Sequence, residues 1–302
     1  MITFCILGDM GSGNSSQIKV SESLSKNIKE NDVKFVCGLG DNIYPAGCYN
    51  INDPQFKIKF EEPYKKIPNK IKFYMCIGNH DYGNYWDQTF RNCSNNQIEY
   101  GIESQKLGKK WYLPGNYYTF SKRQGNTTID FFVIDTNLDL MSESLKNEQM
   151  KYIVKAIKAS KSTWKILYGH HTFISIAGHG NSEPELYRYL RKLFRLGIDI
   201  YFNGHDHNKQ IIETKIGKKV IPVVTCGTGG KVYDDKLNYD NVKKKSKLVW
   251  HAETLGFGTL FCTKSKLRLD MFNENNKLEK TYSIHKSKIK RKSIKTKRKS
   301  RK

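Results

Sequence analysis

Side chains that can bind metal ions follow five separate apolar runs in this sequence of 302 residues. Each run ends in a short loop that contains glycine and one or two carboxylate, phenol, amide or imidazole groups. The candidates are Asp9 in the first loop, Asp41 and Tyr44 in the second, Asn79 and His80 in the third, His170 and His171 in the fourth, and His205 and His207 in the fifth. Oxygen and imidazole donors without a thiolate favour iron, zinc or manganese and argue against a structural zinc site.

The five loops can form one site only if the fold brings them together. A single histidine after a strand is more often a hydrogen-bonded core or capping residue than a metal ligand. Five such loops in the same topological place outweigh that alternative, because sites in layered α/β folds gather at the carboxyl ends of strands. Glycine before the ligands also allows a sharp turn and a close approach by a metal.

The elements that must position these loops alternate in the first half of the chain, which predicts a layered α/β fold. The second half is expected to be mostly antiparallel sheet. We expect strands at 2–7, 34–38, 71–77, 117–121, 128–135, 164–168, 198–202, 209–215, 219–225, 247–252, 257–263, 266–272 and 279–285, helices at 16–30, 53–62, 142–160 and 184–196, and irregular chain over 84–116. One domain over 1–284 followed by a disordered basic tail over 285–302 is the predicted organisation.

The tail carries much of the charge. The net charge is +23, and eleven Lys or Arg residues lie in 286–302 without any acid. A solvated, solubilising end is one interpretation. The other is an arm for nucleic acid, nuclear import or an acidic surface, because clustered cations release counterions from a polyanion.

The rest of the composition suits a folded intracellular protein. No apolar run is long enough to span a membrane, and the first residues indicate a strand rather than a signal peptide. Five of the seven cysteines lie in apolar runs and are expected to be buried thiols. Cys48 and Cys93 lie in loop-like stretches, and the sequence leaves open whether they pair. We expect a monomer.

The motif set resembles the purple acid phosphatases, within the dinuclear metallophosphatases, and especially the small tartrate-resistant type. Many metallophosphatases have Asp-x-His in the first loop, whereas here Asp9 is followed by Met10 and Gly11, and a phenol, Tyr44, follows Asp41. The resemblance extends over about residues 2–284. It implies a four-layer α/β/β/α sandwich of two mixed sheets flanked by helices.

The resemblance also implies a dinuclear metal centre. Asp9, Asp41, Tyr44 and His207 would hold Fe³⁺, while Asp41, Asn79, His170 and His205 would hold Fe²⁺, Zn²⁺ or Mn²⁺, with Asp41 bridging the two ions. His80 and His179 match the family's substrate histidines, which contact the phosphate and protonate the leaving group. His171 matches no ligand, so we expect a supporting or structural role for it. Asp81 is expected only to cap the following turn.

The implied activity is acid phosphatase hydrolysis of phosphomonoesters, by attack of a hydroxide held at the two metals. One rival is a phosphodiesterase or nuclease on the same scaffold, which uses the basic tail to hold nucleic acid. Another is a nucleic-acid-binding or packaging protein with a secondary metal site. Whatever the function, the basic tail allows a location in the nucleus or in a particle that contains nucleic acid. The chain departs from the secreted family members in three ways. We expect it to lack a signal peptide, only a short segment follows Asp135, and it carries a basic tail.

Overall fold

Two mixed β-sheets form the centre of the structure, a computed structural model that describes residues 1–83, 93–234, 236–243 and 245–286. The first sheet has the order β14-β13-β12-β1-β2-β3-β4. Strands β1 to β4 are parallel, and β12 to β14 join antiparallel at the other side of β1. The strands are β1 Ile2–Leu7, β2 Phe35–Gly38, β3 Lys72–Met75, β4 Trp111–Tyr112, β12 Gly256–Cys262, β13 Lys266–Asn273 and β14 Leu278–His285.

The second sheet has the order β11-β9-β10-β8-β7-β6-β5. Its centre, from β6 through β7 and β8 to β10, is parallel, and its edges are antiparallel. The strands are β5 Tyr118–Gln124, β6 Thr127–Val133, β7 Trp164–Tyr168, β8 Ile200–Asn203, β9 Lys209–Ile216, β10 Lys219–Cys226 and β11 Ser246–Ala252.

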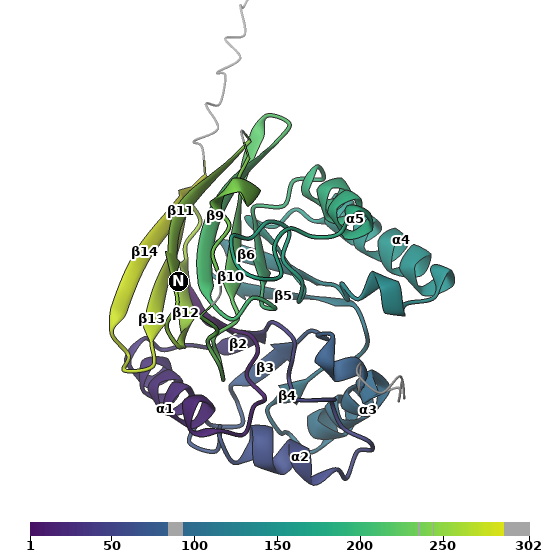
Figure 1. Cartoon of the computed structure of the whole chain (residues 1–302), viewed down its shortest axis with the longest axis vertical. Coiled ribbons are helices and arrows are strands. Elements are labelled where there is room, and N and C mark those ends of the chain that lie inside the picture. The colour runs from purple at the N-terminus through teal and green to yellow at the C-terminus, as the bar shows by residue number, and fades with distance from the viewer. Residues whose placement is uncertain (84–92, 235, 244, 287–302) are drawn as a thin grey trace, which may run out of the picture.

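Helices cover the outer faces of both sheets (Figure 1). They are α1 Ser15–Glu30, α2 Pro54–Phe56 and α3 Cys93–Lys106 beside the first sheet, and α4 Glu143–Ala159 and α5 Pro184–Phe194 beside the second. A π-helical turn, Lys57–Glu61, continues α2, and single 3-10 turns lie at His80–Tyr82, Leu138–Leu140 and Tyr239–Asn241. The predicted four-layer α/β/β/α sandwich of two mixed sheets flanked by helices is confirmed.

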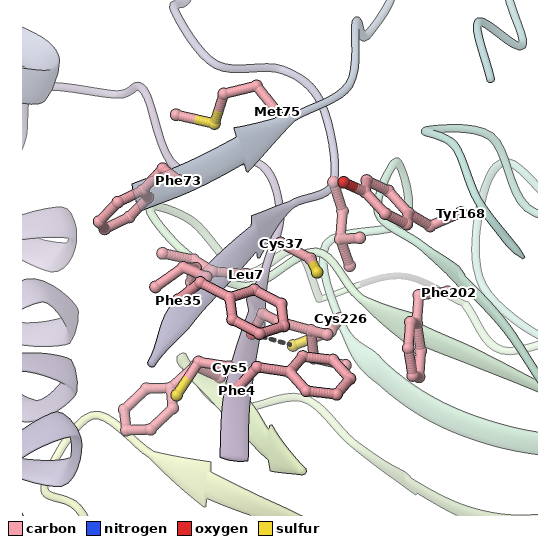
Figure 2. Close-up of a cluster of buried hydrophobic side chains, with 14 of the residues drawn as sticks. Phe4, Cys5, Leu7, Phe35, Cys37, Phe73, Met75, Tyr168, Phe202 and Cys226 are labelled. Atoms are coloured by element: carbon pink, nitrogen blue, oxygen red, sulfur yellow. Dashed lines mark hydrogen bonds between the residues drawn. The ribbon is translucent and has the colours of Figure 1, made fainter. Parts of the chain in front are cut away.

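An aromatic core joins the two sheets, as Figure 2 shows for strands β1, β2, β3, β7 and β8. Phe4 of β1 stacks on Phe35 of β2 with ring centroids 5.0 Å apart, and it meets Phe131 of the second sheet edge-on at 5.2 Å. Each of these rings is buried, and full burial of such a side chain contributes about 1.5–3 kcal/mol. This packing fixes the position of one sheet relative to the other, and with it the loops at the carboxyl ends of both sets of strands.

Local sequence signals, such as capping residues, predicted most helices and strands correctly. Asp53 accepts a hydrogen bond from Gln55 N and caps α2 as predicted, and Ser142 caps α4 in the same way. The expectation of irregular chain over 84–116 was wrong for 93–106, which forms α3. This helix buries Ser94, Gln97, Gly101 and Ser104 rather than an apolar stripe, so hydrophobic periodicity did not reveal it. Residues 84–92 lie outside the described part of the chain.

Two further expectations concern cysteines and membranes. Cys48, in a loop, and Cys93, at the start of α3, are both buried thiols and are not joined by a disulfide. Among the described residues, no helix combines the length and the apolar character needed to cross a bilayer. The basic tail beyond residue 286 lies outside the described residues, so the predicted division at 284 stays a prediction.

Candidate metal centre

The five candidate loops all leave the carboxyl ends of parallel strands. Asp9 follows β1, Asp41 follows β2 and Asn79 follows β3, while His170 follows β7 and His205 follows β8. The first three strands belong to one sheet and the last two to the other. Because the sheets face each other with these ends at one edge, ligands far apart in the sequence meet there.

The first cluster contains the side chains of Asp9, Tyr44 and His207. The Tyr44 hydroxyl lies 3.0 Å from Asp9 Oδ1 and 3.1 Å from His207 Nε2. His207 Nε2 lies 3.6 Å from Asp9 Oδ1. Three donor atoms from three loops therefore converge on one point.

The second cluster contains Asn79, His170 and His205. Asn79 Oδ1 lies 3.0 Å from His170 Nε2 and 3.1 Å from His205 Nδ1, and these two nitrogens are 3.2 Å apart. Asp41 Oδ1 lies 3.4 Å from His170 Nε2. Asp41 also has a carboxylate oxygen within 4.8 Å of ligand atoms of Asp9 in the first cluster and His170 in the second, so it is the side chain that the two clusters share.

These distances fit a metal site. Two donors that each bind one ion at about 2.1 Å and at right angles lie about 3 Å apart, which is the spacing seen within both clusters. His170 Nδ1 donates to the Leu39 carbonyl at 2.9 Å. A carbonyl only accepts, so this bond leaves the lone pair on Nε2 facing the cluster. Asp9, Asp41 and His170 also form a buried group with ligand atoms within 4.8 Å of one another.

The backbone at the site is strained. Asp9, Asp41 and His205 have φ values of 56°, 48° and 71°, and they are three of the five non-glycine residues with positive φ in the described chain. Such conformations cost about 1–3 kcal/mol each and concentrate at functional sites. Glycine permits the close approach: a Cβ on Gly78 would lie 2.1 Å from Asp41 Oδ1, and one on Gly204 would lie 2.3 Å from Asp9 Oδ2.

Burial shifts the acid–base behaviour of the ligands. Burial, together with the nearby Asp41, raises the pKa of Tyr44 well above its usual value. Burial lowers the pKa of His207 to about 4 and that of His205 well below its usual value. Burial also lowers the pKa of His170, but the adjacent Asp41 raises it more, to about 10. Burial raises the pKa of Asp9 well above its usual value, whereas the neighbouring His170 holds the pKa of Asp41 below its usual range despite burial. Cation binding would therefore displace protons from Asp9, Tyr44 and His170.

Asp81 does more than cap a turn, which corrects the expectation. Its carboxylate is fully buried and accepts hydrogen bonds from Asn42 N at 2.9 Å, Gly78 N at 2.8 Å and Gln97 Nε2 at 2.8 Å. Burial raises its pKa to about 6, so it remains ionised at neutral pH. Asp81 ties the Asp41 loop to the Asn79 loop, and no sequence pattern marks this long-range link.

His80 contacts a residue of the first cluster and His179 a residue of the second. The His80 ring is 4.6 Å from the Tyr44 ring, and its Nδ1 donates to the Pro45 carbonyl at 2.6 Å. The His179 ring stacks on His205 at 4.0 Å. His179 N donates to Asp206 Oδ1 at 3.0 Å, so Asp206, which the sequence analysis did not single out, orients this loop.

His171 lies beside the second cluster, with its ring 4.4 Å from that of His205. Its Nδ1 and the Thr136 hydroxyl are 2.8 Å apart. Burial and the neighbouring His170 lower its pKa to about 3. A cavity of about 340 Å³ opens next to it and is lined by His171, His179 and His205 together with residues of the loop before α5. Of the ligand candidates, His205 of the second cluster lines this cavity.

Comparisons with known proteins agree with this geometry. The calcineurin-like phosphoesterase family profile matches residues 2–209. Purple acid phosphatase 17 of Arabidopsis thaliana is 25% identical over 90% of this chain and 82% of its own length. Human tartrate-resistant acid phosphatase type 5 is 27% identical over 76% of this chain and 73% of its own length.

Solved structures share the fold. A purple acid phosphatase from yellow lupin seeds superposes with a TM-score of 0.71 at 19% identity, covering 94% of this chain and 53% of the lupin chain. Plasmodium GAP50, described as the anchor in the inner membrane complex, gives a TM-score of 0.80 at 20% identity over 96% of this chain and 90% of its own. With the family profile matching over most of its length, the chain belongs to the calcineurin-like phosphoesterase family and resembles its purple acid phosphatase branch.

Proposed function

We propose that this protein is a phosphomonoester hydrolase of the purple acid phosphatase type. The observation that carries the proposal is the pair of ligand clusters joined by Asp41. Each cluster offers side-chain donors about 3 Å apart, and the two clusters meet at one carboxylate. Two metal ions joined by one carboxylate are the arrangement used for in-line displacement at phosphorus.

The donor chemistry supports an assignment for each ion. Asp9, Asp41, Tyr44 and His207 would hold Fe³⁺, because a phenolate and two carboxylates supply the hard anionic charge that a trivalent ion requires. Asp41, Asn79, His170 and His205 would hold a divalent ion, Fe²⁺, Zn²⁺ or Mn²⁺. When bound, the pair would supply Lewis-acid stabilisation of the phosphoryl oxygens and a nucleophile generated from water at low pH.

The protein's own residues then position the ester and move protons. His80 keeps its Nδ1 proton on Pro45 O, which leaves Nε2 for the phosphate side. His179 stacks against His205 at the mouth of the 340 Å³ cavity. A phosphate between these two rings would contact both, and one ring would protonate the leaving alkoxide, a step that contributes about 10²–10⁴-fold.

Fold alone does not establish catalysis. GAP50 shares this fold and is described as an anchor, so the proposal for this chain depends on its ligand set. All nine residues expected from the resemblance lie in the described structure, and seven of them form the two clusters.

The experiment compares rates on a phosphomonoester and a phosphodiester for the wild type and Asp41→Asn. We expect a preference for the monoester and a loss of at least about 10²-fold in Asp41→Asn, because one amide cannot serve two cations. Asp32→Asn is the matched control, since Asp32 also has positive φ (50°) and its carboxylate is 82% exposed. Equal activity in Asp41→Asn and Asp32→Asn would contradict the proposal.

The basic tail bears on the main rival. Residues 287–302 lie outside the described structure, and a partner for them, an intracellular location and a monomeric state remain predictions. A chain truncated at residue 286 is expected to hydrolyse the monoester as the full chain does. A preference for single-stranded DNA or a diester that disappears on truncation would instead favour the nuclease.

A further inference from the structure

A second, larger cavity of about 750 Å³ lies between α5, the end of β9 and the loop before β11. Its size is within the range of roughly 300–1,000 Å³ that is typical of ligand pockets. Asn181 lines both this cavity and the one beside the metal centre. The side chain of Asn181 also donates to the Asn241 carbonyl at 3.2 Å, which ties the His179 loop to the cavity wall.

The wall of this cavity is strongly basic. Arg191, Lys215, Lys243 and Lys245 line it, with Asp240 as the one acid among the lining residues. Within the part of the chain that the structure describes, none of these four cations has a carboxylate within ion-pair distance. Lys215 N donates to the Lys245 carbonyl at 2.7 Å, so the two lysines lie on adjacent backbone segments. Like charges on neighbouring segments are unfavourable unless an anion compensates them.

Arg191 supplies a second, independent observation. Its Nε is buried and has no hydrogen-bond acceptor in the described structure. A buried donor without a partner costs about 1–3 kcal/mol. A phosphate oxygen in the cavity would satisfy it, because the guanidinium fork matches phosphate geometry.

Aromatic rings stand beside these cations. Tyr187 lies one helical turn before Arg191 on the same face of α5, and Tyr239 lies on the opposing loop. Tyr187 and Tyr239 are 39% and 53% exposed, and both line the cavity. One face of Tyr187 already stacks on Phe173, with centroids 4.8 Å apart, so Tyr239 is the ring that could stack on a base. Cations that bind phosphate and an aromatic ring that stacks on a base are the features that bind nucleotides without a sequence preference.

We infer that this cavity binds a nucleoside phosphate, either a free nucleotide or one unit of a single strand, with the phosphate at Arg191 and the lysines and the base against Tyr239. The inference goes beyond the proposed hydrolase. It does not depend on the metal centre, because none of the metal-ligand candidates lines the cavity.

The test measures binding of α,β-methylene-ADP, which carries a non-hydrolysable P–C–P linkage, by isothermal titration calorimetry at low salt. Arg191→Gln is expected to weaken binding about tenfold through loss of the bidentate phosphate contact. Lys192→Gln is the matched control, because Lys192 is the exposed neighbour on α5 and does not line the cavity. Both variants should hydrolyse p-nitrophenyl phosphate at the wild-type rate, so failure here is distinguishable from failure of the proposed function.

Two probes identify the ligand. Tyr239→Leu should weaken the nucleotide about fivefold or more by loss of stacking, and methylenediphosphonate, which has no base, should be insensitive to this change. If a short oligothymidylate binds more tightly than the nucleotide, and its binding depends on Arg191, the ligand is a single strand. If the nucleotide binds more tightly, the ligand is the free nucleotide. Equal affinity of the Arg191→Gln and Lys192→Gln variants, or no preference for the nucleotide over methylenediphosphonate, would overturn the inference.

Discussion

Gly78→Ala is a small change that should disable the site. The new Cβ would lie 2.1 Å from Asp41 Oδ1 and 2.2 Å from Asp41 N, whereas ordinary contacts begin at 3.4 Å. Either Asp41 or the Gly78 loop must therefore move by about 1 Å. Overpacking of this kind costs about 1–3 kcal/mol, and a 1 Å displacement of a reacting geometry can cost about 10²-fold in rate.

The assay combines kcat on p-nitrophenyl phosphate, metal content per chain and urea unfolding. Gly78→Ala should lose about 10²-fold in kcat while it remains folded, with reduced occupancy of the metals that Asp41 serves. Gly115→Ala is the control, because its Cβ would meet only Tyr117 O at 3.7 Å and its φ is not in the left-handed region. A Gly78→Ala protein with wild-type metal content and kcat would refute the argument that Asp41 occupies a fixed bridging position.

Three further changes test the residues around the ligands. Asp81→Asn should lower the free energy of unfolding by about 2 kcal/mol, because charge-assisted hydrogen bonds to Asn42 N and Gly78 N weaken; an unchanged urea midpoint would contradict its linking role. His171 is neutral in the fold with a pKa of about 3, so its contribution to stability is complete above about pH 6.5 and declines as pH falls toward 3. The stability difference between the metal-free wild type and metal-free His171→Asn should therefore change by about 3 kcal/mol between pH 7.5 and 4.5 in favour of the variant, and parallel pH profiles would refute this. Asp206→Asn should reduce kcat more than it reduces metal content, because Asp206 holds the His179 loop. If the variant instead loses metal while kcat per bound metal is unchanged, Asp206 supports the metal ligands rather than His179.

The sequence predicted those helices and strands whose signals, such as hydrophobic periodicity, capping residues and apolar runs, lie within the segment itself. Strand β1 and helices α4 and α5 begin within a residue or two of their expected positions. For the two helices the reason is that Ser142 and Pro184 are residue types that favour helix starts. Helix α3 was missed because its buried face is made of Ser94, Gln97, Gly101 and Ser104. Those side chains pack on neighbours that are distant in the sequence, and only tertiary structure reveals that.

The candidate site was predictable for a different reason. Its ligands directly follow strands, so the strand order brings Asp9 and Asp41 to one edge of the first sheet, and the packing of the second sheet against it adds His205. The residues that hold the ligands in place were not predictable in this way. Asp81 and Asp206 act through hydrogen bonds that they accept from backbone groups in other loops, and a carboxylate in a loop is too common for its partner to be inferred from sequence.

The visible absorption spectrum of the purified, iron-loaded protein tests the central claim most directly. A phenolate bound to Fe³⁺ absorbs visible light, so the wild type should be purple and Tyr44→Phe should lose that colour. Tyr44→Phe removes one oxygen that lies 3.0 Å from Asp9 and 3.1 Å from His207 and leaves the ring in place. An iron-loaded wild-type protein that is colourless yet hydrolyses phosphomonoesters at full rate would contradict the assignment of Tyr44 as a ferric ligand.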